Sequence, residues 1–510
     1  MEKEKKEVRK FGWKDKLSYA MGDFGCNMSF ALNGTLTTFY TMYVGLSTEL
    51  MALLIIILKI WDGINDPIMG AIMDRFKPKN GGSKFKPFIF WSAIALVVSG
   101  AMVFLPVAAA PTWVKIVVCI VGYLVWDTAY TVVNVPYGSM ANVITDVPEE
   151  RASLSMWRSV GAMIANLPIM ALLPMIMYRD MVDANGNVVY NPYITDKKEP
   201  IEVLVGKNVF IAALIMGVLG LIAFMILIKF TVERVKPAVE VEENGEPKEK
   251  QKINYWKVIK SFGKNRAAIG MTVASIFQLI MMNGLAVASN ALYKDFFHMG
   301  QESGIISLVS YLPLIIAMPL IVPLVKKYGK KEASQWPLLL GVLGGALMFI
   351  LPESLFLSGA GIAIWIVLQL LVSLSFAVFA TTGWAMVADC IDYQEMITGE
   401  REEGTVYAIY SLGRKIAQGL GASAVLLILG WVGFQEAGFD SVLGVEIPAV
   451  QTPDVANRIR LVIGAVYCVC SLIQFIMIKF VYPLTKEKVT EMNLKLGRNN
   501  DELIGQKEED

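Results

Sequence analysis

The chain has 510 residues, 55% of them hydrophobic, and its mean hydropathy is +0.52. This composition excludes an ordinary soluble domain of that length. The formal net charge of +1 gives no reason to expect a nucleic-acid partner. We therefore expect an integral membrane protein whose main surroundings are the lipid bilayer.

Apolar runs long enough to cross a bilayer recur along the chain. About 20 apolar residues suffice for one span, and twelve runs have their centres near residues 30, 60, 97, 126, 165, 218, 278, 314, 343, 373, 420 and 470. A charged segment rich in Pro, Glu and Lys separates the first six from the last six. We expect an all-α membrane protein of twelve helices in two six-helix bundles, a layout typical of major facilitator transporters.

The basic residues predict the orientation of the chain. Lys and Arg concentrate in the N-terminal arm, after the second run and in the charged linker, so the positive-inside rule places both termini in the cytoplasm of a plasma-membrane protein. The predicted parts are an N-terminal arm (1–16), an N-terminal bundle (17–231) with an extracellular loop (178–208), a cytoplasmic linker (232–265), a C-terminal bundle (266–484) and a cytoplasmic tail (485–510). The extracellular loop holds Asn-Gly and Asn-Pro turn signals around a short VVY run, which is compatible with a small hairpin or a plain loop.

Residue types that would support metal or thiol chemistry are sparse. The five cysteines form no CxxC pair, and His298 is the only histidine. No nucleophile–base pair is visible either. We expect neither an enzyme nor a cofactor, and no bound metal other than a coupling Na⁺.

The second apolar run contains charges where a bilayer would be crossed. Lys59, Asp62 and Asp66 lie at helical spacings of three and four, so they share one face, with Asn65 beside them. Charges at that depth are costly and seldom face lipid. They predict a polar stripe turned toward a cation or a solute, and the alternative is an ion pair that only holds helices together.

The fourth run repeats this pattern. Asp127, Tyr130, Thr131 and Asn134 also share a helical face, before Pro136, which we expect to disturb the helix. Hydroxyl and amide oxygens are good ligands for a small hard cation, and a buried carboxylate can instead take up a proton. Both versions predict a cation-coupling site. Alternatively, the Thr131 hydroxyl could only donate a hydrogen bond to a backbone carbonyl of its own helix.

Other polar residues suit a sugar. Asp23 and Asn27 lie one turn apart in the first run, and Arg158 begins the fifth just inside the membrane, where it needs an acceptor. In the second half, Trp384 and Lys415 offer an aromatic ring and a donor. Sugars present C–H faces that stack on rings and hydroxyls that need hydrogen-bonding partners.

Two charged clusters on the cytoplasmic side are candidate gates. Gly70, Asp74 and Arg75 match the Gly-x-x-x-Asp-Arg loop pattern of major facilitators. The segment after the tenth run concentrates acids and a base: Asp389, Asp392, Glu395, Arg401 and Glu402. These residues either form salt bridges that hold a gate shut or belong to a solvated loop.

Three motifs carry a family resemblance that spans nearly the whole chain. They occur in order: KIWDGINDPIMGAIMDRFKPKNGGSKFKPFI, NVPYGSM and VADCIDYQEMITGEREEG. The chain resembles the glycoside–pentoside–hexuronide:cation symporters. By this resemblance Asp62, Asp66, Thr131 and Asn134 are implied cation ligands, and Asn27, Tyr130, Arg158 and Lys415 are implied sugar contacts.

The sequence departs from the family's melibiose permeases at four positions. Those proteins have aspartate at Asn27 and Asn134, tryptophan at Gly138 and arginine at Lys59. The Asn and NxPYG pattern is similar to the lactose, xyloside and glucuronide branches, several of which are thought to couple to H⁺. The coupling ion is therefore Na⁺ or H⁺.

The resemblance implies a symporter that imports a glycoside, pentoside, hexuronide or small oligosaccharide by alternating access. We expect it to function as a monomer. The alternatives are a lysolipid transporter of the same fold, a non-transporting sugar sensor and a polyspecific drug exporter.

Overall fold

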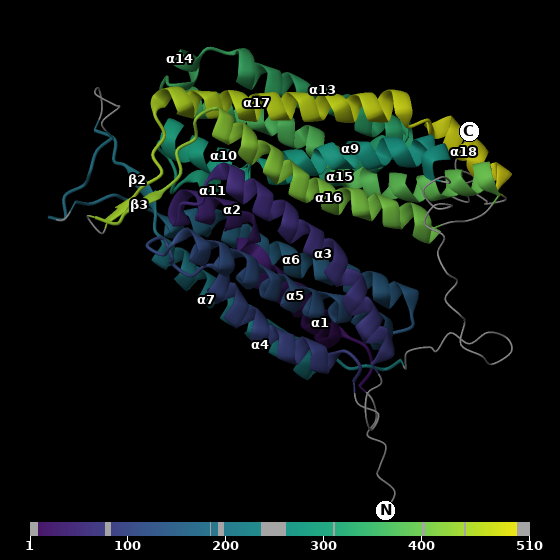
Figure 1. Cartoon of the computed structure of the whole chain (residues 1–510). Coiled ribbons are helices and arrows are strands. Elements are labelled where there is room, and N and C mark those ends of the chain that lie inside the picture. The colour runs from purple at the N-terminus through teal and green to yellow at the C-terminus, as the bar shows by residue number, and fades with distance from the viewer. Residues whose placement is uncertain are drawn as a thin grey trace, which may run out of the picture. The chain divides into compact units, whose positions relative to one another are not determined.

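A computed structural model describes residues 9–76, 83–183, 185–191, 198–235, 262–309, 312–399, 403–442 and 445–496 (Figure 1). The chain divides into two compact units, which are described separately. Unit 1 comprises Met1–Gln251, Gly300–Ile305 and Gln435–Val450, and unit 2 comprises Lys252–Met299, Ile306–Phe434 and Gln451–Asp510. Most of the predicted linker, 236–261, and the tail from 497 lie outside the described residues.

Unit 1 is built from long apolar helices. They are α1 (Trp13–Phe30), α2 (Leu36–Phe39), α3 (Thr48–Arg75), α4 (Lys86–Val103), α5 (Thr112–Ile144), α6 (Pro148–Met177) and α7 (Gly206–Phe230), with short turns η1 (Ala31–Thr35) and η2 (Tyr40–Val44). Helix α3 begins where the Ser47 hydroxyl accepts a hydrogen bond from Leu50 N at 3.2 Å. Helix α1 packs against α6 and α7, α3 against α5, and α4 against α5 and α7.

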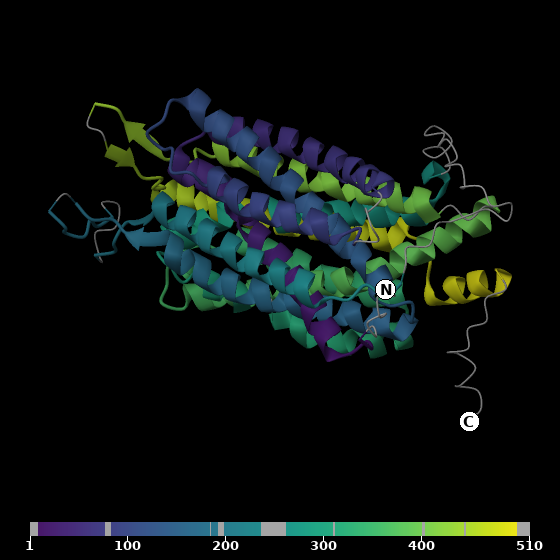
Figure 2. The same ribbon diagram turned by 90° about the horizontal axis from the view of Figure 1, so that it is seen from below.

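Unit 2 has the same construction. Its elements are α9 (Arg266–Gly284), α10 (Ala286–Ala291), η4 (Leu292–Phe296), α11 (Ser303–Val309), α12 (Leu312–Tyr328), α13 (Lys330–Ile350), α14 (Glu353–Phe356), α15 (Gly361–Thr398), α16 (Glu403–Trp431), α17 (Pro453–Ile476), η5 (Met477–Val481) and α18 (Lys486–Lys495), although α11 begins within unit 1. Asn265 caps α9 by accepting from Ala268 N at 2.8 Å. Helix α13 packs against α15 and α17, and α16 packs against α9 (Figures 1 and 2).

Nine helices among the described residues are long and apolar enough to cross a membrane. The other three predicted spans correspond to α1, α3 and α12. Helix α12 has only 17 residues and follows two residues outside the described part. Helices α1 and α3 are less apolar than the other nine because they carry several charged side chains, which in α3 include Lys59, Asp62 and Asp66. The residues that reduce the apolar character of α3 are therefore those predicted to bind a cation.

Two short hairpins lie at one end of unit 1 (Figure 1). In the predicted loop, β1 (Tyr178–Asp180) pairs antiparallel with β2 (Glu202–Leu204), and the VVY run adds isolated bridges. Hydrogen bonds from the backbone of Asn187 and Asn185 stabilise the turn there and hold the pKa of the Asp183 carboxyl below its ordinary value. The hairpin of β3 (Gly438–Asp440) and β4 (Val445–Ile447) was not predicted.

Pro136, which was expected to disturb the helix, does not end it. Helix α5 continues through Pro136 to Ile144. Proline is tolerated within membrane helices because neighbouring groups can satisfy the freed backbone carbonyl. All the predicted polar positions of the fourth run therefore lie on a single helix.

Candidate functional site

Helices α3 and α5 are joined by a ladder of polar contacts. The hydrogen bonds that cross between them include Lys59 Nζ to Tyr123 Oη at 3.0 Å, Asn65 Nδ2 to Asp127 Oδ2 at 3.3 Å, and Thr131 Oγ1 to Asp66 Oδ1 at 3.1 Å. The residue numbers increase together on both helices, so the two helices run parallel. The predicted stripes of the second and fourth runs therefore face each other.

Charge along this ladder is unbalanced. Lys59 Nζ forms an ion pair with Asp62 Oδ2 at 3.3 Å. Asp127 accepts a hydrogen bond from the neutral Asn65 amide and is only 2% exposed. The ladder thus holds two more carboxylates than ammonium groups. Burial of uncompensated charge is costly, so this surplus favours the uptake of a cation or a proton.

Asn134, another predicted cation ligand, contacts α1. Its Oδ1 accepts from Cys26 Sγ of α1 at 4.0 Å, whereas Thr131, one turn earlier, bonds to Asp66. Among the described residues, no three His, Cys, Asp or Glu side chains converge to hold a metal ion. A cation bound at this ladder would therefore need neutral oxygens beside the carboxylates, and Thr131 and Asn65 are the nearest.

A second polar network links α1 to α6. Arg158 Nε donates to Asp23 Oδ1 at 2.9 Å, and the guanidinium carbon lies 5.2 Å from the centre of the Tyr137 ring. Asn27 Nδ2 donates to Asp23 Oδ2 at 3.2 Å, while Asn27 Oδ1 accepts from Asn166 Nδ2 at 2.8 Å. The structure thus brings together Asn27 and Arg158, and it adds Asp23 and Asn166 to them.

Two neighbours define the space around this network. Tyr130 stacks on Phe30, with ring centres 4.2 Å apart. A Cβ atom added at Gly138 would lie 3.9 Å from Arg158 Nη1. Gly138 therefore lies directly beside the Arg158 guanidinium, where a small side chain would make an ordinary contact.

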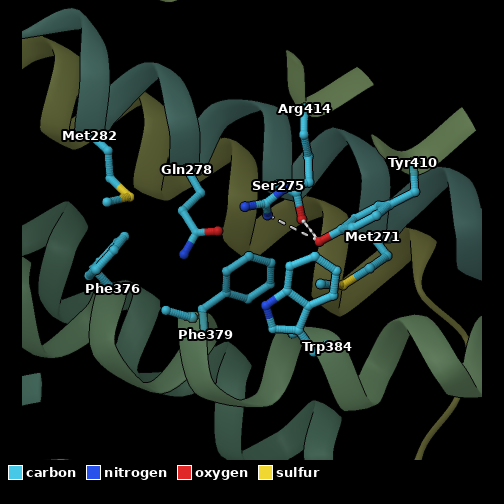
Figure 3. A pocket seen from close by; sticks show the side chains of 11 residues that line it. Met271, Ser275, Gln278, Met282, Phe376, Phe379, Trp384, Tyr410 and Arg414 are labelled. Carbon is cyan, nitrogen blue, oxygen red and sulfur yellow. Dashed lines mark hydrogen bonds between the residues drawn. The ribbon is translucent and has the colours of Figure 1, made fainter. Parts of the chain in front are cut away.

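Unit 2 contains a cavity of about 200 Å³ between α9, α15 and α16 (Figure 3). Its lining residues are Met271, Ser275, Gln278, Met282, Phe376, Phe379, Ala380, Gly383, Trp384, Tyr410 and Arg414. Arg414 Nη1 donates to Tyr410 Oη at 3.2 Å, and this hydroxyl also bonds to Ser275 Oγ at 3.0 Å. The Arg414 guanidinium carbon lies 5.2 Å from the centre of the Trp384 ring.

This cavity contains one of the two residues predicted for the second half. Trp384 lines it, whereas Lys415 does not and its neighbour Arg414 does. Tyr410 and Arg414 lie four residues apart, so they share one helical face. Lys415 is the next residue after Arg414 and therefore lies on a different face. That spacing was available in the sequence and could have identified Arg414.

The predicted gating residues lie in different settings. Lys330 Nζ pairs with Asp389 Oδ1 at 2.7 Å, which joins α13 to α15. Asp392 is half-buried one turn further along α15. Asp74 and Arg75 end α3, where Arg75 is exposed. Arg401 lies outside the described residues.

Comparisons with known proteins support the resemblance. The family model described as MFS/sugar transport protein matches residues 18–486. The chain is 25% identical to the glucuronide carrier protein homolog of Escherichia coli, covering 96% of each chain. It is 26% identical to the putative glycoside/cation symporter YagG of the same organism, covering 95% of this chain and 94% of that one.

A solved structure shows the same fold. The inward-open xylose transporter XylE from E. coli matches with a TM-score of 0.58 at 14% identity, covering 94% of this chain and 98% of that one. The family and these neighbours are transporters and not enzymes. The chain is a multi-pass membrane protein of the major facilitator fold, and it belongs to the MFS/sugar transport protein family.

Proposed function

We propose that this protein imports a glycoside, pentoside, hexuronide or small oligosaccharide together with Na⁺ or H⁺, by alternating access. Relatives named as a glycoside/cation symporter and a glucuronide carrier homolog support a sugar substrate and a coupling ion. We further propose that the protein lies in the cell membrane with both termini in the cytoplasm, because its basic residues concentrate in the segments on that side. In this proposal the monomer is the functional unit.

The surplus of carboxylate on the α3–α5 ladder carries the proposal. The ladder contains the carboxylates of Asp62, Asp66 and Asp127 and the ammonium group of Lys59, which pairs with Asp62. A proton on one of them removes a negative charge. A sodium ion at Asp62 and Asp66 would do the same, with the Thr131 hydroxyl rotating to offer its lone pairs in place of its proton.

The network of Asp23, Asn27, Arg158 and Asn166 is the proposed sugar site of unit 1. It presents two amides, a carboxylate and a guanidinium, which together can both donate to and accept from sugar hydroxyls. Arg158 is already paired with Asp23, so a neutral hydroxyl could bind there without introducing an unpaired charge. Tyr130 supplies an aromatic wall beside this network.

Coupling requires that cation and sugar favour the same conformation of the protein. Each ligand then increases the affinity for the other by an equal factor. The ladder and the sugar network are linked through α5 and α1, because Asn134 of α5 contacts Cys26 and Cys26 precedes Asn27. We propose that this contact transmits part of the coupling.

The Lys330–Asp389 pair is the proposed latch of a cytoplasmic gate in unit 2. Asp389 is 6% exposed, and its second oxygen has no hydrogen-bonding partner. Breaking this ion pair would leave the buried Asp389 carboxylate without its counter-charge. The free-energy cost of that step would keep the pair closed, as a latch requires. Asp74, Arg75, Asp392 and Arg401 are proposed to contribute to the same function on sequence grounds.

The test is ion flux into proteoliposomes on addition of a panel of glycosides, read separately for H⁺ and Na⁺. We expect a sugar-dependent flux of one ion in the wild type. Asp66→Asn should abolish accumulation against a gradient while it retains exchange of sugar across the membrane. Asp454→Asn is the matched control, because Asp454 is exposed on α17 and forms an ion pair with Arg458 on the same helix.

Each outcome assigns the function. Accumulation that is unchanged in Asp66→Asn would remove Asp66 from coupling. A sugar-dependent ion flux excludes a sensor and a lipid transporter. No flux with any sugar, from protein that elutes as a single folded species, would overturn the proposal in favour of lipid transport or sensing.

A further inference from the structure

The cavity of unit 2 contains a positive charge whose contacts are all neutral. Arg414 bonds to the Tyr410 hydroxyl and lies over the Trp384 and Tyr410 rings, at 5.2 and 5.5 Å from their centres. No carboxylate among the described residues forms an ion pair with it. The Tyr410 hydroxyl occupies one of the five N–H donors of the guanidinium.

Two cations of the sites in unit 1 are neutralised. Arg158 pairs with Asp23 at 2.9 Å, and Lys59 pairs with Asp62 at 3.3 Å. An arginine in the interior of a membrane protein usually has a counter-charge, because an unpaired charge there is costly. Arg414 is therefore the cation in these sites that a ligand could neutralise.

Gln278 gives a second, independent indication of a ligand. Its side chain lines the same cavity and is only 5% exposed, yet no hydrogen bond joins it to another of the described residues. Figure 3 shows the Gln278 amide, the Trp384 indole and the Arg414 guanidinium facing one space from three different helices. Because the Gln278 amide faces the cavity, a sugar hydroxyl bound there could take up hydrogen bonds with it.

The cavity suits one sugar ring with an acidic group. Its volume of about 200 Å³ is below the range of about 300–1,000 Å³ found for complete ligand pockets, so it would hold one part of a larger substrate. The Trp384 ring can stack on a sugar face, and Gln278 can bond ring hydroxyls. A guanidinium matches the two oxygens of a carboxylate or sulfonate in a bidentate pair.

We propose that Arg414 binds the carboxylate or sulfonate of an anionic sugar and selects such sugars over neutral ones. This inference rests on the proposed function and narrows its substrate class. Arg414 thus determines specificity, whereas Gln278 and Trp384 contribute to the binding of any sugar. The held guanidinium is preorganised, since Tyr410 and Trp384 fix it before the anion arrives.

The test compares uptake of three matched probes into proteoliposomes: methyl glucuronide, methyl sulfoquinovoside and methyl glucoside, each as both anomers. These probes differ in the group at C6, which is a carboxylate, a sulfonate or a hydroxymethyl group. The wild type should favour at least one acidic probe over the glucoside by about tenfold or more. The probe that is favoured distinguishes carboxylate from sulfonate.

Three variants separate charge from shape. Arg414→Met keeps the length of the side chain without its charge, and should lose about 10- to 100-fold in apparent affinity for the acidic probe but less than about threefold for the glucoside. Gln278→Leu should weaken acidic and neutral probes alike. Arg458→Met removes a cation of unit 2 that is exposed on α17 and outside the cavity, and should change neither affinity.

Two results would overturn the inference in different ways. Equal losses for acidic and neutral probes in Arg414→Met, or a wild type without acid preference, would refute anion selection while sugar transport stands. Failure of every probe to enter with folded wild-type protein under both H⁺ and Na⁺ gradients would refute the proposed function itself.

Discussion

Asp127 is more deeply buried than Asp62, the carboxylate that pairs with Lys59. The exposed fraction is 2% for Asp127, against 19% for the Asp62 side chain. Its contact in the ladder is the neutral amide of Asn65 at 3.3 Å. The sequence predicted that Asp127 shares a helical face with Thr131 and Asn134, but Asp127 was not among the predicted cation ligands. Its burial makes it the carboxylate whose charge is most sensitive to a bound cation.

We predict that Asp127→Asn weakens cation coupling without unfolding the protein. The new amide oxygen can still accept from Asn65, so the bond between α3 and α5 remains while one negative charge is lost. The concentration of coupling ion that gives half-maximal uptake should rise about tenfold, the loss expected for one charge-assisted contact. The measurement is uptake at fixed sugar over a range of Na⁺ and of pH. An unchanged ion dependence would show that Asp127 has only a structural role.

The sequence predicted single residues best where charge interrupts an apolar run. Lys59, Asp62 and Asp66 stand out because Leu, Ile and Met surround them, and they do face the polar side of α5. Arg414 was not predicted, whereas its neighbour Lys415 was. The rotation of about 100° between successive helical residues makes these neighbours face different surroundings.

At the scale of elements, close contacts between helices depend on small residues. A Cβ atom added at Gly161 of α6 would lie 2.2 Å from the carbonyl oxygen of Ala20 on α1. Such contact with backbone cannot be relieved by a rotamer change. The same contact positions Arg158, which is one turn before Gly161, beside Asp23.

We predict that Gly161→Ala destabilises the protein by about 1–3 kcal/mol and weakens sugar binding, because α6 must move away from α1. The matched control is Gly138→Ala, whose added Cβ would make only an ordinary contact at 3.9 Å with Arg158. The measurement is the temperature at which half of the detergent-solubilised protein loses its monodisperse elution peak. Equal stability of the two variants would contradict the close packing of α1 and α6.

The long apolar helices were predictable from hydropathy, whereas the short strands were not. Strands β3 and β4 have three residues each, too few for an alternation of apolar and polar side chains to be recognised in the sequence. Their surroundings involve residues far away in the chain, because Ala437 N donates to Thr41 O at 3.0 Å. Contacts of such long sequence separation leave no local pattern to detect.

At the scale of the whole molecule, two segments belong to unit 1 although the chain on either side of them belongs to unit 2: Gly300–Ile305 and Gln435–Val450. Carboxylates fix both segments. Glu202 accepts from Gly300 N at 2.6 Å and from Gln301 N at 3.2 Å. Glu436 accepts from the backbone N and the hydroxyl of Thr48 at 2.8 and 3.0 Å. These tethers lie at the same end of unit 1 as both hairpins.

In an alternating-access cycle, contacts at one end of the helices must form and break in every turnover, so the strength of these tethers affects the conformational equilibrium. We predict that Glu436→Ala frees the segment Gln435–Val450 from unit 1, because Thr48 loses both hydrogen bonds to a charged acceptor. Hydrogen–deuterium exchange of peptides from this segment and from the start of α3 should accelerate about tenfold or more.

Glu49→Ala is the matched control, since Glu49 is the exposed carboxylate next to Thr48 in the first turn of α3. If the tether also limits transport, bound sugar should slow exchange at this segment in the wild type or accelerate it, according to the conformation that the sugar favours. Exchange that is the same in Glu436→Ala and Glu49→Ala would show that the Glu436–Thr48 contact does not hold the segment in place.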